Sequence, residues 1–109
     1  MNTPGFDPVS VTGLVAGGAN LVAFTTGRGS VYGSAIAPTV KIATTSELFG
    51  RMRGDMDVDA GRALVAGVAP VGEEIYRALV EVASGRRTAS EQLGLGWEEF
   101  VPWAVGETL

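Results

Sequence analysis

The stretch from Asn20 to Thr44 constrains the fold more than any other part of this chain. An apolar run over residues 21–26 breaks into a glycine-rich turn, and a second β-branched run follows over residues 39–44. Both runs predict short strands. The first is apolar enough to be buried on both faces, whereas the alternation around Lys41 in the second indicates a face that meets a polar group. Whether the strands are parallel stays open, because a crossover usually needs a dozen or more residues.

Helix signals surround these runs. Asp7-Pro8 is typical of a helix start, with Asp7 as N-cap, although a loop is nearly as well supported there. Residues 44–47 have the spacing of a capping box and predict a short helix to about Arg53. After it we expect an extended segment over residues 55–59, a helical stretch near residues 62–66 and a loop over residues 67–70.

The best helix is predicted over residues 71–84, where an apolar stripe recurs at helical spacing. Glu73 and Arg77 are placed to form an i,i+4 ion pair, and Gly85 is placed to end the helix. Residues 88–91 offer a second capping box. The tail over residues 97–109 carries both tryptophans, so we expect it to pack back on the domain or on a partner. The stripe consists of Val71, Ile75, Leu79 and Val82.

Composition excludes several classes of function. The chain has 109 residues, the natural size of one small domain, and contains neither cysteine nor histidine. That removes thiol and imidazole nucleophiles and most transition-metal sites. The net charge of −4 argues against a nucleic-acid surface. No apolar run approaches a membrane span, and the start lacks a secretory signal, so a cytoplasmic location is expected.

The turn after the first strand is the sharpest candidate for a binding site. Glycines on both sides of Arg28 allow the backbone to bend and bring amide N–H groups and a guanidinium to one place. That combination suits a carboxylate or a phosphate. The alternative, an ordinary solvated turn with Arg28 at its tip, is about equally well supported. The candidate binding residues are Thr25, Thr26, Gly27, Arg28, Gly29 and Ser30.

Lys41 and three aspartates are weaker candidates. Lys41 lies in an otherwise apolar strand and either faces the same pocket as Arg28 or snorkels at a sheet edge. Asp55, Asp57 and Asp59 have strand spacing and would share one face, where carboxylates can hold a divalent cation or share a proton. A solvated acidic face is the more usual explanation of such a run.

Several stretches together resemble the C-terminal part of the altronate dehydratase and galactarate dehydratase family of sugar-acid hydro-lyases. They are TPGFDPVSVTGLVAGGANL, AFTTGRGSVYGSAIAPTVKIATTSELFGRM, DMDVDAG and EVASGRRTASEQLGLGWEEFVPWAVG, and they cover essentially the whole chain. The resemblance implies a Rossmann-like, three-layer α/β fragment with a mostly parallel sheet, short helices and Gly-rich loops. It also implies dehydration of a hexonate or hexarate to a 2-keto-3-deoxy acid, helped by Fe²⁺ or another divalent metal.

In that family this sequence would be the last portion of a longer enzyme, which favours parallel pairing of the two strands. The enzyme must hold the substrate carboxylate, stabilise an enediolate and protonate the leaving hydroxide. By position, Arg28 with its flanking glycines would hold the carboxylate, and Lys41, Asp57 and Asp59 would line the same cavity.

Metal ligands and the base would come from upstream domains or a separately encoded partner, since some relatives have cysteine where this chain has Ala23, Ser34 and Ala60. We therefore expect the chain alone to be catalytically incomplete, and a homodimer is also plausible. The alternative is a stand-alone, non-catalytic domain that binds a small acid or a protein.

Overall fold

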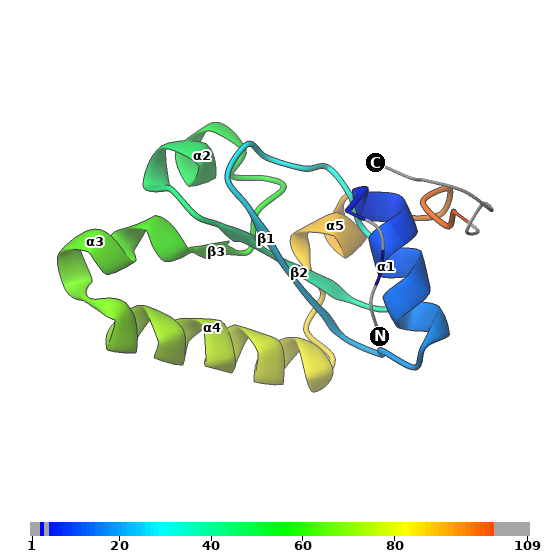
Figure 1. The fold of residues 1–109 in the computed structure, drawn as a ribbon. Helices are drawn as coiled ribbons and strands as arrows, with labels where there is room; N and C mark the ends of the chain where they lie inside the picture. Colours follow the sequence, from blue (N-terminus) through cyan, green and yellow to red (C-terminus); the bar gives the residue numbers. More distant parts are fainter. Residues whose placement is uncertain (1–2, 4, 102–109) are drawn as a thin grey trace.

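Three parallel strands form the sheet of this protein in the order β1-β2-β3 (Figure 1). The computed structural model describes residues 3 and 5–101. The strands are β1 (Val22–Thr26), β2 (Thr39–Ala43) and β3 (Val58–Asp59). Val22 lies opposite Thr39, and Ile42 lies opposite Val58. Because both pairings are parallel, all three strands end at the same edge of the sheet. The predicted α/β class and the parallel pairing are confirmed.

The core is built around β2, whose five residues are all buried. On one face, Val40 and Ile42 pack with Ala78 and Val82 of α4 (Val68–Ala83). Side chains alternate between the faces of a strand. On the opposite face, Ala43 therefore packs with Leu48 of α2 (Ser46–Arg51). Helices thus lie against both faces of the sheet.

The face that carries Ala43 is also covered near the start of β1. Val11 of α1 (Asp7–Ala16) forms a second cluster there with Val22, Tyr32 and Ala37. Residues 32 and 37 belong to the connection over residues 27–38, which contains no regular element. The Tyr32 ring stacks on Phe24 with the centroids 6.0 Å apart. Aromatic packing rather than a crossover helix therefore fixes this connection.

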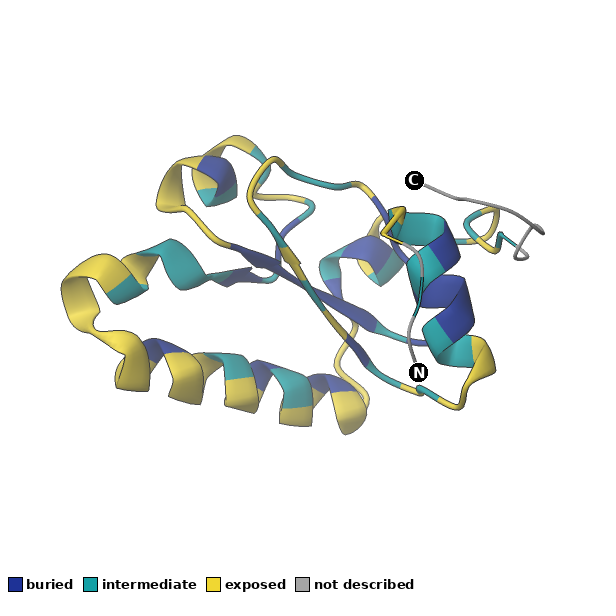
Figure 2. Ribbon diagram, in the orientation of Figure 1, coloured by how far each residue is buried: buried dark blue, intermediate teal, exposed yellow. Residues whose placement is uncertain are grey.

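Burial of the two predicted strands differs from the expectation. Only Val22 of β1 is buried, because β1 is an edge strand, so the expectation of burial on both faces was wrong. The second run does meet a polar group, as expected, although inside the protein: the Lys41 side chain is completely buried and its Nζ donates to the Ser30 carbonyl at 3.0 Å. Figure 2 shows β2 buried throughout and β1 only partly.

The helices between β2 and α4 follow the prediction with shifted boundaries. α2 is capped by Thr45, one residue later than the capping box indicated, and the Thr45 hydroxyl accepts from the Leu48 N–H at 3.2 Å. A 3₁₀ turn, η1 (Ala60–Arg62), leads into α3 (Ala63–Ala66). The loop expected over residues 67–70 is instead the start of α4. Pro70 fits there because N–H groups in a first helical turn have no intrahelical partner.

The first helix and the part of the chain from α4 onwards also agree closely with the prediction. α1 is a helix, but Asp7 lies inside its first turn and does not cap it. The Arg77 Nε donates to Glu73 at 3.2 Å, and α5 (Ala89–Gln92) has the predicted capping box. The part of the tail within the described residues does contact the domain, since the Val101 N–H donates to the Thr12 hydroxyl at 2.9 Å.

Trp97 itself is 81% exposed, and Trp103 lies outside the described residues. No helix among residues 3 and 5–101 is long and apolar enough to cross a bilayer.

A glycine contact at the carboxyl edge gives a stability test. A Cβ at Gly61 would overlap the backbone nitrogen of Ser46, whereas a Cβ at Gly50 would meet nothing within 4 Å. Gly61→Ala should therefore lower the free energy of unfolding by about 1–3 kcal/mol through overpacking. Gly50→Ala, inside α2, should raise it by about 0.5–1 kcal/mol. Urea unfolding of both variants measures the difference, and equal effects would contradict this packing.

Candidate functional site at the carboxyl edge of the sheet

The turn that follows β1 is shaped by its own hydrogen bonds. The Thr26 hydroxyl accepts from the Gly29 N–H at 3.0 Å, and the Thr44 hydroxyl donates to the Thr26 carbonyl at 3.2 Å. Gly29 has a φ of +102°, and a Cβ there would overlap the Met52 sulfur. Glycine suits this position because the left-handed conformation strains any other residue, and a Cβ would also require the Met52 side chain to move.

The three predicted hydroxyl groups of this turn do not act as one set. The Ser30 hydroxyl accepts from the Tyr32 N–H at 3.1 Å and lies 3.5 Å from an Asp7 carboxylate oxygen. Thr26 and Ser30 therefore help to fold the turn. Thr25 pairs with Ile42, so its exposed side chain lies on the α4 face of the sheet. The structure separates Thr25 from the other two.

Arg28 stands exposed at the tip of this turn. Within the described part of the chain its guanidinium forms no ion pair and no hydrogen bond, whereas Arg62, Arg77 and Arg86 each pair with a glutamate. Arg28 lines none of the cavities described below. The guanidinium is thus free to take an anion, but none of these cavities of the described residues encloses it. Its role in carboxylate binding stays a prediction.

Lys41, the only lysine in the sequence, is hydrogen-bonded to the end of this turn. Its side chain is completely buried, and Nζ donates to the Ser30 carbonyl at 3.0 Å. Burial lowers the pKa of Lys41, while the carboxylates of Asp55, Asp57 and Glu99 act in the opposite direction. Since no part of the amine reaches solvent, Lys41 in this arrangement positions the turn and does not contact a ligand.

The two aspartates proposed beside Lys41 are held by the backbone. The Asp57 carboxylate accepts from the Lys41 N–H and from the Ala89 N–H, both at 2.8 Å. The Asp59 carboxylate accepts from the Gly61 N–H and the Ser46 hydroxyl, both at 3.0 Å. Both groups therefore fix segments of the fold. The structure brings Lys41 to the turn, but it does not gather these side chains in one cavity.

A cavity of about 310 Å³ lies between the end of α2 and the segment that precedes α5, and the sequence analysis did not find it. Three arginines line it, together with Asp57. The Arg86 guanidinium pairs with Glu81 at 2.6 Å, and that of Arg53 lies 5.8 Å from the centre of the Phe49 ring. Three cations around one hollow could hold a small anion. The adjacent arginines of the sequence Gly85-Arg86-Arg87 were the signal from which this anion site could have been predicted. The three arginines are Arg53, Arg86 and Arg87.

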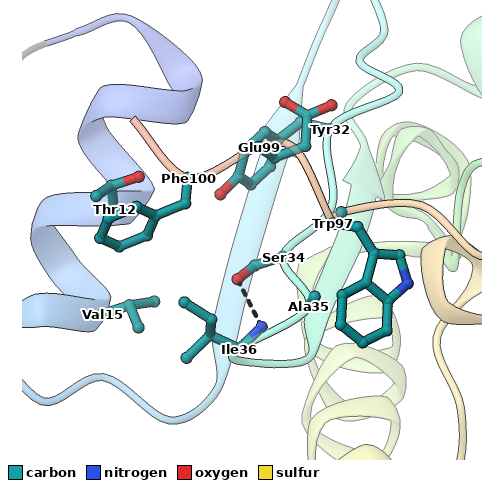
Figure 3. Close-up of a pocket in the computed structure, with 10 residues that line it drawn as sticks. Thr12, Val15, Tyr32, Ser34, Ala35, Ile36, Trp97, Glu99 and Phe100 are labelled. Atoms are coloured by element: carbon teal, nitrogen blue, oxygen red, sulfur yellow. Dashed lines mark hydrogen bonds between the residues drawn. The ribbon is translucent and has the colours of Figure 1, made fainter. Parts of the chain in front are cut away.

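A second cavity, of about 170 Å³, lies between α1, residues 34–36 and residues 96–100 (Figure 3). Its lining includes Val15, Ile36 and Phe100, and the Ser34 hydroxyl accepts from the Ile36 N–H at 3.2 Å. Glu99 also lines it, and burial together with Glu99 raises the pKa of Tyr32. A negative charge at the rim makes this cavity unsuitable for an acid.

The residues that the structure describes do not fit an iron site. Among residues 3 and 5–101 there is no group of three acidic residues that could hold a metal, and the whole sequence lacks cysteine and histidine. Asp57 and Asp59, the nearest candidates, each already accept two hydrogen bonds.

Fold and site together define a small parallel α/β domain with a glycine-flanked arginine at the carboxyl edge of its sheet. The family model of the C-terminal region of D-galactarate/altronate dehydratases matches residues 1–108. The chain therefore belongs to that family.

Curated relatives support the same assignment over only part of their length. Altronate dehydratase of Escherichia coli is 40% identical over 93 residues, which cover 84% of this chain and 19% of the relative. Galactarate dehydratase (L-threo-forming) of the same organism is 40% identical over 85% of this chain and 18% of its own length. The β subunit of a (2R)-sulfolactate sulfo-lyase from Chromohalobacter salexigens is 32% identical over 72% of this chain and 20% of its own length. The chain spans about a fifth of these proteins.

Burial of Lys41 makes a prediction about pH. Its pKa in the folded state lies below the ordinary value of 10.5, so the unfolded chain binds the proton more tightly. The contribution of this lysine to stability should therefore rise as the pH rises towards 10.5 and be lost as the pH falls through the folded-state pKa. Tyr32, whose pKa is raised above 10.0, acts oppositely at alkaline pH. Subtracting the unfolding free energy of Lys41→Met from that of the parent at each pH isolates Lys41, and a flat difference would contradict the prediction.

Proposed function

We propose that this chain is the C-terminal portion of a sugar-acid hydro-lyase, which converts a hexonate or hexarate such as altronate or galactarate to a 2-keto-3-deoxy acid. The single observation that carries the proposal is the family match over nearly the whole chain. The isolated chain is proposed to lack activity, because its relatives are about five times longer.

The names of the relatives indicate which part of a substrate a shared region would recognise. Altronate, galactarate and (2R)-sulfolactate each carry a carboxylate with a hydroxyl on the neighbouring carbon. The relatives that act on them are named dehydratases in two cases and a sulfo-lyase in the third, so water is lost in two and a sulfo group in the other. A region that is similar in all three relatives is better explained by recognition of the 2-hydroxy acid end, which the three substrates share, than by recognition of the leaving group, which differs. A group that binds a carboxylate is therefore the expected contribution of this chain.

Arg28 is the group we assign to that contact. Its guanidinium is exposed, is unpaired within the described residues, and is presented at the edge where all three strands end. In open α/β sheets ligands bind outside the carboxyl ends of the strands. Backbone N–H groups of the glycine-flanked turn can bind the same carboxylate together with the guanidinium. Lys41 supports the turn from beneath through the Ser30 carbonyl.

The remaining catalytic groups are proposed to come from the preceding portion of the enzyme. A divalent metal, Fe²⁺ in this proposal, would be held there, since Asp57 already accepts from two backbone N–H groups and Asp59 from a backbone N–H and the Ser46 hydroxyl. The group that removes the proton from the carbon next to the carboxylate would come from the same portion. The alternative function is a stand-alone domain that binds a small acid, and the cavity lined by Arg53, Arg86 and Arg87 is the observation that favours it.

Replacing Arg28 tests the carboxylate contact. In the complete enzyme, Arg28→Ala should lower kcat/KM for the sugar acid by between about 30-fold and several thousand-fold, the equivalent of roughly 2–5 kcal/mol for removing one partner of a charge pair. Arg28→Lys should recover only part of the loss, because lysine cannot form the bidentate contact. Arg51→Ala, in the exposed last turn of α2, is the matched control. Turnover within a few-fold of the parent for Arg28→Ala would remove Arg28 from this role.

Activity of the chain alone tests its incompleteness. Incubated with Fe²⁺ and altronate or galactarate, the 109-residue chain should form no 2-keto-3-deoxy acid, and the same assay with the preceding portion present should form it. Product from the chain alone would contradict the proposed division of groups. Titration of the chain with the same acids, followed through the NMR shifts of Arg28 and Arg87, separates binding without turnover from no binding at all.

A further inference from the structure

The outer edge of β1 carries backbone groups that nothing in the described structure uses. The Val22 N–H donates to the Pro38 carbonyl at 2.9 Å, and the Thr44 N–H donates to the Thr26 carbonyl at 3.0 Å. Alternate residues of a parallel strand face the same neighbour, so Val22, Phe24 and Thr26 face β2. Ala23 and Thr25 consequently direct their N–H and C=O groups away from the sheet. No strand among residues 3 and 5–101 lies on that side.

This edge also lacks the features that protect exposed edges. Edge strands are usually short, or carry charges or proline that prevent pairing with another chain. The opposite edge, β3, has only two residues. β1 has five residues, with the sequence VAFTT, and none of them is charged or proline. Such a strand is typical of one that is paired in the complete protein.

The flank of α4 on the β1 side is apolar and poorly covered. On the β3 side, Glu74, Arg77 and Glu81 line a cavity together with Asp57 and Val58. By helical geometry the opposite flank of α4 carries Val68, Tyr76 and Leu79. Val68 is 80% exposed and Tyr76 64% exposed, while Leu79 packs only partly against the core.

Ala23 and Thr25 are exposed, and they share one face of the sheet because side chains alternate along a strand. Figure 2 shows β1 partly exposed beside the buried β2. The unused backbone groups of Ala23 and Thr25 and the apolar flank of α4 both lie on the β1 side of the domain, and we call this combination the β1 edge surface.

We propose that a β-strand from the preceding portion of the complete enzyme pairs with β1 and covers this apolar flank of α4. The occupant is argued from length, since the matched C-terminal region makes up only 19% and 18% of the two E. coli relatives. The inference rests on the proposed function only in requiring that larger enzyme. A strand supplies hydrogen-bond partners for the unpaired N–H and C=O groups of Ala23 and Thr25. A helix packed at this edge cannot do so, because its own backbone groups are already paired.

The added strand would lie next to the candidate site. Arg28 follows β1 by two residues, so a strand parallel to β1 would end beside the arginine turn. Groups from the preceding portion would then reach the carboxyl edge without any change in this domain. This placement supplies the walls that Arg28 lacks within the described residues.

Amide hydrogen exchange, resolved by residue in the complete enzyme, tests the pairing. The Phe24 N–H faces β2 and should be protected in any case, so it is the internal control. If the added strand is present, the N–H groups of Ala23 and Thr25 should exchange about 100-fold or more slowly than in an unstructured chain, as the Phe24 N–H does. Exchange of Ala23 and Thr25 at unstructured rates, with Phe24 protected, would overturn the proposal. Neither outcome depends on catalysis, so the test is separate from that of the proposed function.

A pair of variants identifies the occupant. Ala23→Pro removes an outward N–H and blocks pairing, whereas Ala23→Val keeps the N–H and strengthens the strand propensity. Ala23→Pro should abolish the protection of Thr25 in the complete enzyme, and Ala23→Val should retain it. Protection of Thr25 that persists in Ala23→Pro would overturn strand pairing. Protection in the parent that disappears on dilution would assign the edge to a second copy and would also overturn the proposal. If Ala23→Pro unfolds β1 and exposes Phe24, the exchange pattern of the parent still decides.

Discussion

The carboxylate of Asp57 is the contact on which the arrangement of this domain depends. One oxygen accepts from the Lys41 N–H in the central strand and the other from the Ala89 N–H at the start of α5, each at 2.8 Å. Its own N–H donates to the Lys41 carbonyl at 2.8 Å. Two segments far apart in the sequence, β2 and the start of α5, are thereby fixed to the residue that precedes β3. A carboxylate that accepts two backbone donors replaces the strand pairing that β3 is too short to provide.

This anchoring accounts for the unusual position of the only lysine. β2 is central and fully buried, so Lys41 cannot reach water, and its amine donates to the Ser30 carbonyl instead. Burial of an amine is unfavourable unless it is hydrogen-bonded and near opposite charges. Asp55, Asp57 and Glu99 provide those charges. The outcome is a rigid link between the middle of the sheet and the end of the arginine turn.

Local signals in the sequence predicted much of the fold because they depend on neighbouring residues alone. The capping box at Thr88 and the Glu73–Arg77 pair belong to this group. The parallel pairing was expected from the family resemblance alone, because the spacing left it open. The strand order was not predictable, so β1 was expected to be buried and was found at the edge. The same limit applies to the site. Spacing placed Asp57 and Asp59 on one face, but which backbone amides they accept from depends on how distant segments pack.

In the turn that presents Arg28, the groups that fix the backbone differ from the group that can bind a ligand. The Thr26 hydroxyl, the Ser30 hydroxyl and the φ of Gly29 all serve the path of the backbone. The Arg28 guanidinium, by contrast, forms no ion pair and no hydrogen bond within the described residues. A turn that is rigid, open to solvent and singly charged can orient one end of an acid but cannot exclude water from it. Because reacting groups act most strongly in a water-poor environment, this geometry supports the proposal that the turn faces a second surface, which a strand paired with the open edge of β1 would place beside it.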